Sequence, residues 1–140
     1  MAVQKVFVDT SGFYSLLIRT DSHHPQAVAA VRKMRDSGVK AFTTDYIIDE
    51  TCTLFKARGF AHLTRSLLVL FDTTQALEFH FVGEENFRKA RDYFERHLDH
   101  GYSFTDCTSF ILMREMRVQE ALTKDAHFSE AGFTVLLGAG

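Results

Sequence analysis

The feature that most constrains the fold of this chain is an apolar segment, residues 6–8, that ends at a carboxylate, Asp9. The segment reads Val-Phe-Val, and such β-branched and aromatic residues are typical of a buried strand. The strand would place Asp9 at its carboxyl end, the edge at which open α/β sheets bind ligands. A structural role is equally compatible with this segment, because Asp9 or Ser11 could cap a following helix.

Strand-like and helix-like segments alternate along the rest of the chain. The further strands are expected at residues 39–43, 77–82, 121–123 and 133–137. Amphipathic helical patterns separate them, which predicts an α/β fold with a parallel sheet covered by helices on both faces. Because crossovers between parallel strands share one hand, the loops after the strands should meet at one edge of the sheet.

Length and composition predict one globular domain. The chain has 140 residues, of which 46% are hydrophobic, and its single proline and eight glycines leave no room for a linker. Cys52 and Cys107 stand alone without metal-ligand spacing, which is typical of reduced thiols in a cytoplasmic protein. We see neither a leader nor an apolar run of about 18 residues, so we expect no membrane segment.

Four acidic residues are expected near the same edge of the sheet. Asp9 ends the first strand, Asp125 follows residues 121–123, and Asp106 opens a helix expected over residues 106–116. Glu50 lies within the first two turns of the helix after the second strand. Four carboxylates gathered in this way would repel one another strongly unless a cation lies between them.

Each acid also has a structural interpretation that the sequence leaves open. Ser103 and Asp106 match a capping box, and Asp125 could cap the turn over residues 126–129. Glu50 could be a salt-bridged surface acid or one that extends along apolar surface into solvent. Only the set as a whole favours a functional site.

The chemistry of such a set favours a hard divalent cation. Carboxylates with few nearby histidines suit Mg²⁺ or Mn²⁺ better than zinc. A magnesium ion held this way suits attack of an activated water on a phosphodiester. The net charge of −2 argues against a protein that coats nucleic acid, so any attraction for RNA must be local.

Five segments in order resemble a known family. They are residues 7–11 (FVDTS), 49–51 (DET), 102–110 (YSFTDCTSF), 122–128 (LTKDAHF) and 131–133 (AGF). Together they resemble the PIN domain, and in particular the VapC-type toxin ribonucleases of bacterial and archaeal toxin–antitoxin pairs. The resemblance covers essentially the whole chain. It implies a five-stranded parallel sheet, Mg²⁺- or Mn²⁺-dependent cleavage of RNA, and inhibition by a small antitoxin protein.

Carried over by residue, the acid quartet of that family falls on Asp9, Glu50, Asp106 and Asp125. We therefore predict one PIN-like nuclease domain over residues 1–140, acting as an endoribonuclease and as the toxin of a type II pair. Asp9, Asp106 and Asp125 would hold the metal, and Glu50 would position or deprotonate the attacking water. The alternatives are a stand-alone RNA-processing nuclease and a catalytically silent RNA-binding or assembly module. A phosphatase is disfavoured because Ser11 stands where its second aspartate is usual.

Three further features concern partners. Six basic residues near the expected site could contact RNA or be ordinary surface: Arg19, Lys56, Arg58, Arg65, Arg114 and Lys124. His127 could contact phosphate or be structural. The apolar face of residues 60–72, with Leu63, Leu67, Leu70 and Phe71, is wide for a surface helix, and we expect a homodimer through the helices of residues 44–72.

Overall fold

The computed structural model describes residues 4–73 and 76–138, which form five strands and seven helices. The elements in chain order are β1 (Lys5–Val8), α1 (Thr10–Leu17), α2 (His24–Asp36), β2 (Lys40–Thr44), α3 (Asp45–Ala57), α4 (Ala61–Thr73), β3 (Leu77–His80), α5 (Gly83–Arg96), α6 (Phe104–Glu115), β4 (Glu120–Leu122), α7 (Ala126–Glu130) and β5 (Thr134–Val135). All the strands pair in parallel in one sheet of order β3-β2-β1-β4-β5. The predicted α/β class and parallel sheet are confirmed.

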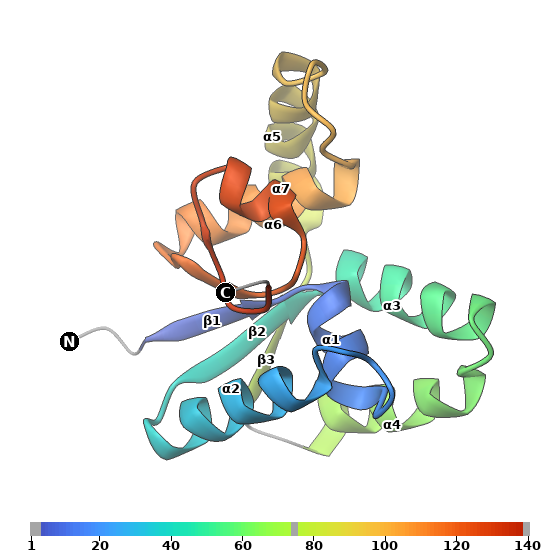
Figure 1. The fold of residues 1–140 in the computed structure, drawn as a ribbon. Coiled ribbons are helices and arrows are strands. Elements are labelled where there is room, and N and C mark those ends of the chain that lie inside the picture. The colour runs from blue at the N-terminus through green and yellow to red at the C-terminus, as the bar shows by residue number, and fades with distance from the viewer. Residues whose placement is uncertain (1–3, 74–75, 139–140) are drawn as a thin grey trace.

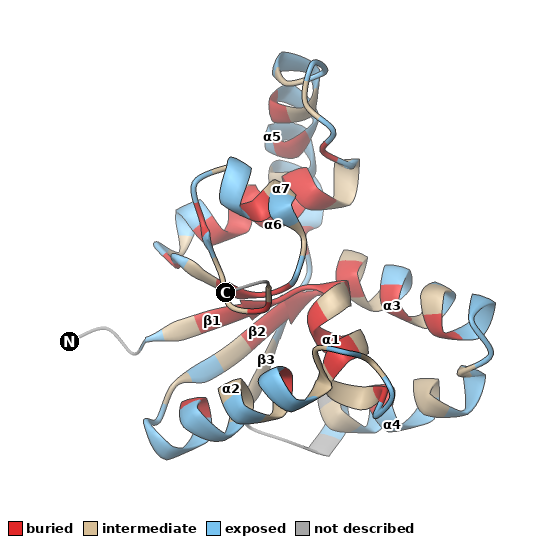
Figure 2. Ribbon diagram, in the orientation of Figure 1, coloured by how far each residue is buried: buried red, intermediate tan, exposed pale blue. Residues whose placement is uncertain are grey.

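Helices cover both faces of the sheet. Figure 1 shows α1 to α4 on one side and α5 to α7 on the other. The central strands are buried, as Figure 2 shows, because apolar side chains leave β1 toward both layers. The ring of Phe7 packs edge-on against Phe42 at 5.2 Å and stacks with Phe128 at 6.2 Å between centroids. The packed sheet therefore gives firm support to the residues at the carboxyl ends of its strands.

The carboxyl ends of β1, β2 and β4 lie side by side. Phe7 is in register with Phe42 on one side and with Ala121 on the other, and Val8 is opposite Leu122. The chain then continues into α1 directly after Asp9, into α3 directly after Thr44, and into α7 after Asp125. The predicted meeting of strand ends at one edge is confirmed, and this edge carries the candidate site.

The bounds of the helices and strands differ from those expected from the sequence by only a few residues. Gly38 has a φ of 70° just after α2, the left-handed conformation in which a glycine commonly ends a helix. Helix α6 begins at Phe104, so Asp106 is its third residue rather than its first. The last strand is shorter than expected, because only residues 134–135 pair with β4. Both cysteines are free, with Cys107 buried and Cys52 half-buried.

Gly12 is required by the close approach of α1 to β4. A Cβ built on Gly12 would overlap the carbonyl oxygen of Leu122, which also accepts a hydrogen bond from the Asp9 amide at 3.2 Å. We expect Gly12→Ala to lower the free energy of unfolding by about 1–3 kcal/mol or more, because backbone cannot yield as a side chain can. Urea denaturation measures this. Gly138→Ala is the control, since its Cβ would meet nothing within 4 Å. Equal stability of Gly12→Ala and the wild type would contradict the packing.

Within the described residues, we find no helix that is long and apolar enough to cross a membrane.

Candidate active site

The carboxylate of Asp9 is buried at the end of β1. The residue is 5% exposed, and the Thr123 hydroxyl donates a hydrogen bond to Oδ2 at 2.8 Å. Asp9 occupies the N-cap position of α1, but its side chain makes no capping hydrogen bond. The rival cap, Ser11, is bonded to Thr123 and to the Lys124 amide instead. The interpretation of Asp9 as a simple helix cap is therefore wrong.

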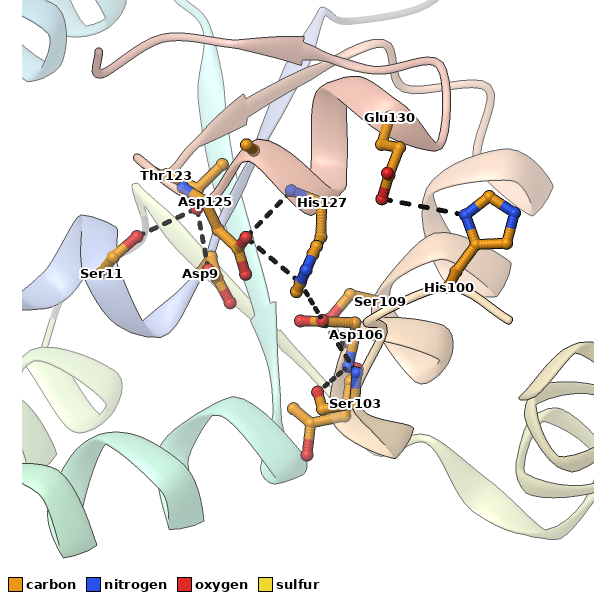
Figure 3. Close-up of polar contacts among 12 residues, drawn as sticks. Asp9, Ser11, His100, Ser103, Asp106, Ser109, Thr123, Asp125, His127 and Glu130 are labelled. Carbon is orange, nitrogen blue, oxygen red and sulfur yellow. Dashed lines mark hydrogen bonds and ion pairs between the residues drawn. The ribbon is translucent and has the colours of Figure 1, made fainter. Parts of the chain in front are cut away.

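A chain of hydroxyl groups fixes this carboxylate (Figure 3). The single hydroxyl proton of Thr123 goes to Asp9, so Ser11 must donate to Thr123 across their 2.9 Å contact. The Thr123 oxygen also accepts from the Asp125 amide at 3.0 Å. Every hydrogen-bonding position of the Thr123 hydroxyl is thus used, and the network ties the loop before α7 to the first turn of α1.

Asp106 has two roles at once. Its amide donates to Ser103 Oγ at 2.9 Å and its Oδ2 accepts from the Ser103 amide at 3.0 Å, so the capping box is confirmed. The same Oδ2 lies 3.2 Å from Nδ1 of His127, and the residue is 8% exposed. The capping box holds the Asp106 carboxylate against His127, so a capping role and a place in the acid cluster do not exclude each other.

Asp125 approaches Asp106 from the other side of His127. It caps α7 by accepting from the His127 amide at 2.9 Å, and its Oδ1 lies 3.3 Å from His127 Nδ1. Figure 3 shows the imidazole pointing between the two acids. The ligand atoms of Asp106, Asp125 and His127 all lie within 4.8 Å of one another, as a metal-binding group requires.

His127 is the site residue that the sequence left undecided. A Cβ on Gly101 would lie 2.9 Å from its Nε2, so the glycine leaves room for the ring, and Tyr102 packs edge-on at 5.7 Å. The only sequence feature that pointed to His127 was its position two residues after Asp125, in the first turn of a helix that this aspartate caps. That signal places the His127 amide but does not determine where the ring points.

Glu50 lies at the exposed rim of the site. The Thr10 hydroxyl donates to its Oε1 at 2.5 Å, and no basic residue among those described lies within 4.0 Å of it. The salt-bridge alternative is therefore wrong within the described part of the chain. Glu50 lines a cavity of about 200 Å³ together with Asp9 and Asp125. The four predicted acids thus come together, with Asp9 and Asp106 buried and the other two more open.

The carboxylates influence one another electrostatically. Burial raises the pKa of Asp9 to about 7, against hydrogen bonds from Thr123 and the Thr10 amide, and the charges of Asp106 and Glu50 raise it further. Burial and the charge of Asp125 raise the pKa of Asp106, and burial with the charges of Asp106 and Asp125 raises that of Glu50. Such a cluster favours a bound cation, and its oxygen donors fit Mg²⁺ or Mn²⁺.

Comparison with known proteins places this geometry in a family. A sequence model described as "PIN domain" matches residues 6–134. The 23S rRNA-specific endonuclease VapC20 of Mycobacterium tuberculosis is 31% identical over 129 residues, which are 91% of this chain and 95% of that protein. A VapC ribonuclease of Archaeoglobus fulgidus is 29% identical over 124 residues, covering 87% of this chain and 78% of the relative.

Solved structures of similar fold agree with the sequence comparisons. The crystal structure of Mycobacterium tuberculosis VapC20, described as a sarcin–ricin loop cleaving toxin, superimposes with a TM-score of 0.82 at 27% identity, over 94% of this chain and 98% of that one. FitAcB from Neisseria gonorrhoeae shares the fold, with a TM-score of 0.61 at 13% identity over 93% of this chain and 95% of its own. The chain therefore belongs to the PIN domain family and groups with its VapC members.

Proposed function

We propose that this protein is a divalent-metal-dependent endoribonuclease. The observation that carries the proposal is the convergence of Asp9, Glu50, Asp106 and Asp125 from four separate segments on one site, with the pKa values of three of them raised. A fold gains nothing from gathering carboxylates that repel one another, two of them buried, whereas a cation makes the set favourable. The VapC relatives, one named as a 23S rRNA-specific endonuclease and the other as a ribonuclease, support the same conclusion.

The residues divide into two roles. Asp9, Asp106 and Asp125 would hold Mg²⁺ or Mn²⁺, which when bound lowers the pKa of water and offsets the charge of a phosphodiester. Glu50 would orient the attacking water and take its proton, because the residue lies at the exposed rim of the site and the raised pKa of its carboxyl makes it a better base. The Thr10 hydroxyl fixes Glu50 for this task. One P–O bond forms to the water oxygen, and the bond to the departing ribose oxygen breaks.

This mechanism predicts the chemistry of the RNA ends. Because water attacks the phosphorus, the 2′-hydroxyl of the substrate takes no part, and the products should carry no 2′,3′-cyclic phosphate. A hairpin containing the sarcin–ricin loop, the target named for VapC20, is the first RNA to test. A matched hairpin with 2′-deoxyribose at the cut site should still be cleaved. A cyclic phosphate, or failure of the deoxy substrate alone, would contradict water as the nucleophile.

We propose further that the protein is the toxin of a type II pair, with a small co-expressed antitoxin as its partner in the cytoplasm. The support is its likeness to VapC20, which is described as a toxin. Induced expression should arrest bacterial growth, and the Asp9→Asn variant should not. A short upstream reading frame that encodes a DNA-binding fold with a flexible tail should relieve the arrest. Without such a frame or any growth arrest, the stand-alone nuclease would be favoured.

We also expect a homodimer through α3 and α4. Leu67 is fully buried within the fold itself, so it is not available to a partner, whereas Leu68 and Val69 are 46% and 48% exposed. Leu63 and Leu70 are half-buried, and the side chain of Phe71 lies outside the described residues. Sedimentation should give twice the monomer mass at tens of micromolar. A monomer at that concentration would contradict the expectation, and Leu68→Lys should dissociate the dimer.

A further inference from the structure

One wall of the acidic cavity is basic and aromatic. The cavity of about 200 Å³ that Asp9, Glu50 and Asp125 line is also lined by Tyr14 of α1, by Arg58 at the end of α3 and by Lys124 after β4. These three residues come from segments far apart in the sequence. The fold thus brings two of the six candidate basic residues to the carboxylates. A third, Arg114, instead packs over the rings of Tyr93 and Phe133.

Both cations lie against the same tyrosine ring. The guanidinium carbon of Arg58 is 5.6 Å from the Tyr14 ring centroid, and the Lys124 ammonium nitrogen is 5.9 Å from it. Both distances are within the range of cation–π attraction. Tyr14 is itself held by edge-on packing against Phe55 and Phe60 at 6.0 and 6.1 Å. The ring therefore keeps two positive charges beside the site on a packed support.

The acids of the site do not neutralise these cations. Among the described residues, Arg58 has no carboxylate within 4.0 Å, and the only one that close to Lys124 is Asp21, at 3.8 Å. Asp21 lies outside the acid cluster and is held by the Ser15 hydroxyl at 2.8 Å and the His23 amide at 3.1 Å. It orients Lys124 while both cations remain available to an anion in the cavity.

A backbone hydrogen bond holds Lys124 next to the helix that carries Tyr14. The Lys124 amide donates to Ser11 Oγ at 3.0 Å, and Ser11 belongs to the first turn of the helix that carries Tyr14. The hydroxyl chain that positions Asp9 therefore also fixes the distance from the acids to the basic wall. An extended anion that reached the carboxylates would meet the two cations at a fixed spacing.

We propose that Arg58 and Lys124 bind an RNA phosphate next to the one that is cut, on the surface that Tyr14 provides. The inference rests on the proposed function and adds which residues hold the substrate strand. The protein has a net charge of −2 and four clustered acids, so RNA must be attracted to it locally. The positive charges of Arg58 and Lys124 supply this attraction. Because neither side chain touches the cut bond, both would contribute to binding rather than to the chemical step.

The test measures RNA binding separately from cleavage. Fluorescence anisotropy of a labelled hairpin in EDTA, over a range of salt concentrations, compares the wild type with Arg58→Met, Lys124→Met and the double variant. Each single change should weaken binding roughly tenfold, which is about 1.4 kcal/mol, and reduce the slope of log K against log salt by about 0.7. Arg58→Lys should retain the slope because it retains the charge. Lys56→Met, an exposed lysine of α3 outside the cavity, is the control and should change neither quantity.

Cleavage kinetics give a second, independent readout. With metal present, the Arg58 and Lys124 variants should raise KM and leave kcat close to the wild-type value. Salt slopes and affinities equal to those of Lys56→Met would overturn the proposed subsite, even if the wild type cleaves RNA. If the wild type binds RNA with the predicted slopes but cleaves none, the proposed function fails and the binding assignment stands.

Discussion

Asp9→Asn should abolish RNA cleavage without destabilising the metal-free protein. Asparagine keeps the shape and the oxygen that accepts from Thr123, so the hydrogen bond between them can persist. It removes a charge that is buried beside Asp106 and Glu50, so the unfolding free energy without metal should stay level or rise. If Asp9 holds the metal as proposed, its loss should lower kcat/KM by ~10² or more. Thermal unfolding in EDTA and cleavage in Mn²⁺ measure the two effects.

Two companion variants make this result specific. Asp106→Asn should likewise lose cleavage without losing metal-free stability. The gain in stability should be smaller than for Asp9→Asn, because the Asp106 carboxylate also accepts from the Ser103 amide in the capping box. Asp49→Asn removes a neighbouring exposed charge from α3, and Asp49 does not line the cavity, so it should keep nearly full activity. An Asp9→Asn protein that retains full metal-dependent cleavage would remove Asp9 from the site.

Metal-free stability should fall as the pH rises from about 4 to 7. The pKa of Asp9 is raised from 3.8 to about 7, chiefly by burial, so over this range the unfolded chain has lost a proton that the folded chain retains. The unfolded state binds fewer protons, and the free energy of unfolding therefore decreases with pH. Asp9 alone should account for roughly 2–3 kcal/mol between pH 5 and 8. The raised pKa values of Glu50 and Asp106 act in the same direction.

Comparing the unfolding free energies of the wild type and Asp9→Asn separates the contribution of Asp9 from those of the other titrating groups. Asp21 and Glu78 have lowered pKa values and act in the opposite direction, but they are common to the wild type and to Asp9→Asn. Urea denaturation in EDTA at several pH values should give stability curves that converge at about pH 4 and below, with Asp9→Asn more stable at pH 8. Saturating Mn²⁺ should stabilise the wild type more at pH 8 than at pH 5, because the ligands must be ionised. Parallel curves would mean that Asp9 titrates normally.

The fold was predictable because its signals are local and repeated. A buried strand that ends at Asp9, and alternating strands and helices after it, determine a parallel sheet whose strand ends share one edge. That topology brings together acids that lie more than a hundred residues apart, without any knowledge of side-chain contacts. The start of α3 is equally local, because the Thr44 side chain caps the helix by accepting from the Ile47 amide at 3.2 Å.

The finer parts of the site depend on contacts that no spacing encodes. Whether Asp9 capped a helix or bound Thr123 depended on the loop before α7 reaching α1, which needs Gly12. The ring of His127 points at the acids because Gly101 leaves room for it on the opposite side. Capping and the contact with His127 are also compatible at Asp106 and Asp125, because in each acid the carboxylate oxygen that accepts the capping hydrogen bond also lies against the His127 ring.

The most direct test of the central claim is cleavage of the sarcin–ricin hairpin by the same protein before and after removal of metal. The acids of this site cannot activate water near neutral pH by themselves, so thorough chelation with EDTA should eliminate cleavage. Excess Mg²⁺ or Mn²⁺ should restore it in the wild type and not in Asp9→Asn. Cleavage that survives chelation, or that Asp9→Asn regains with metal, would contradict a carboxylate-held cation as the basis of the activity.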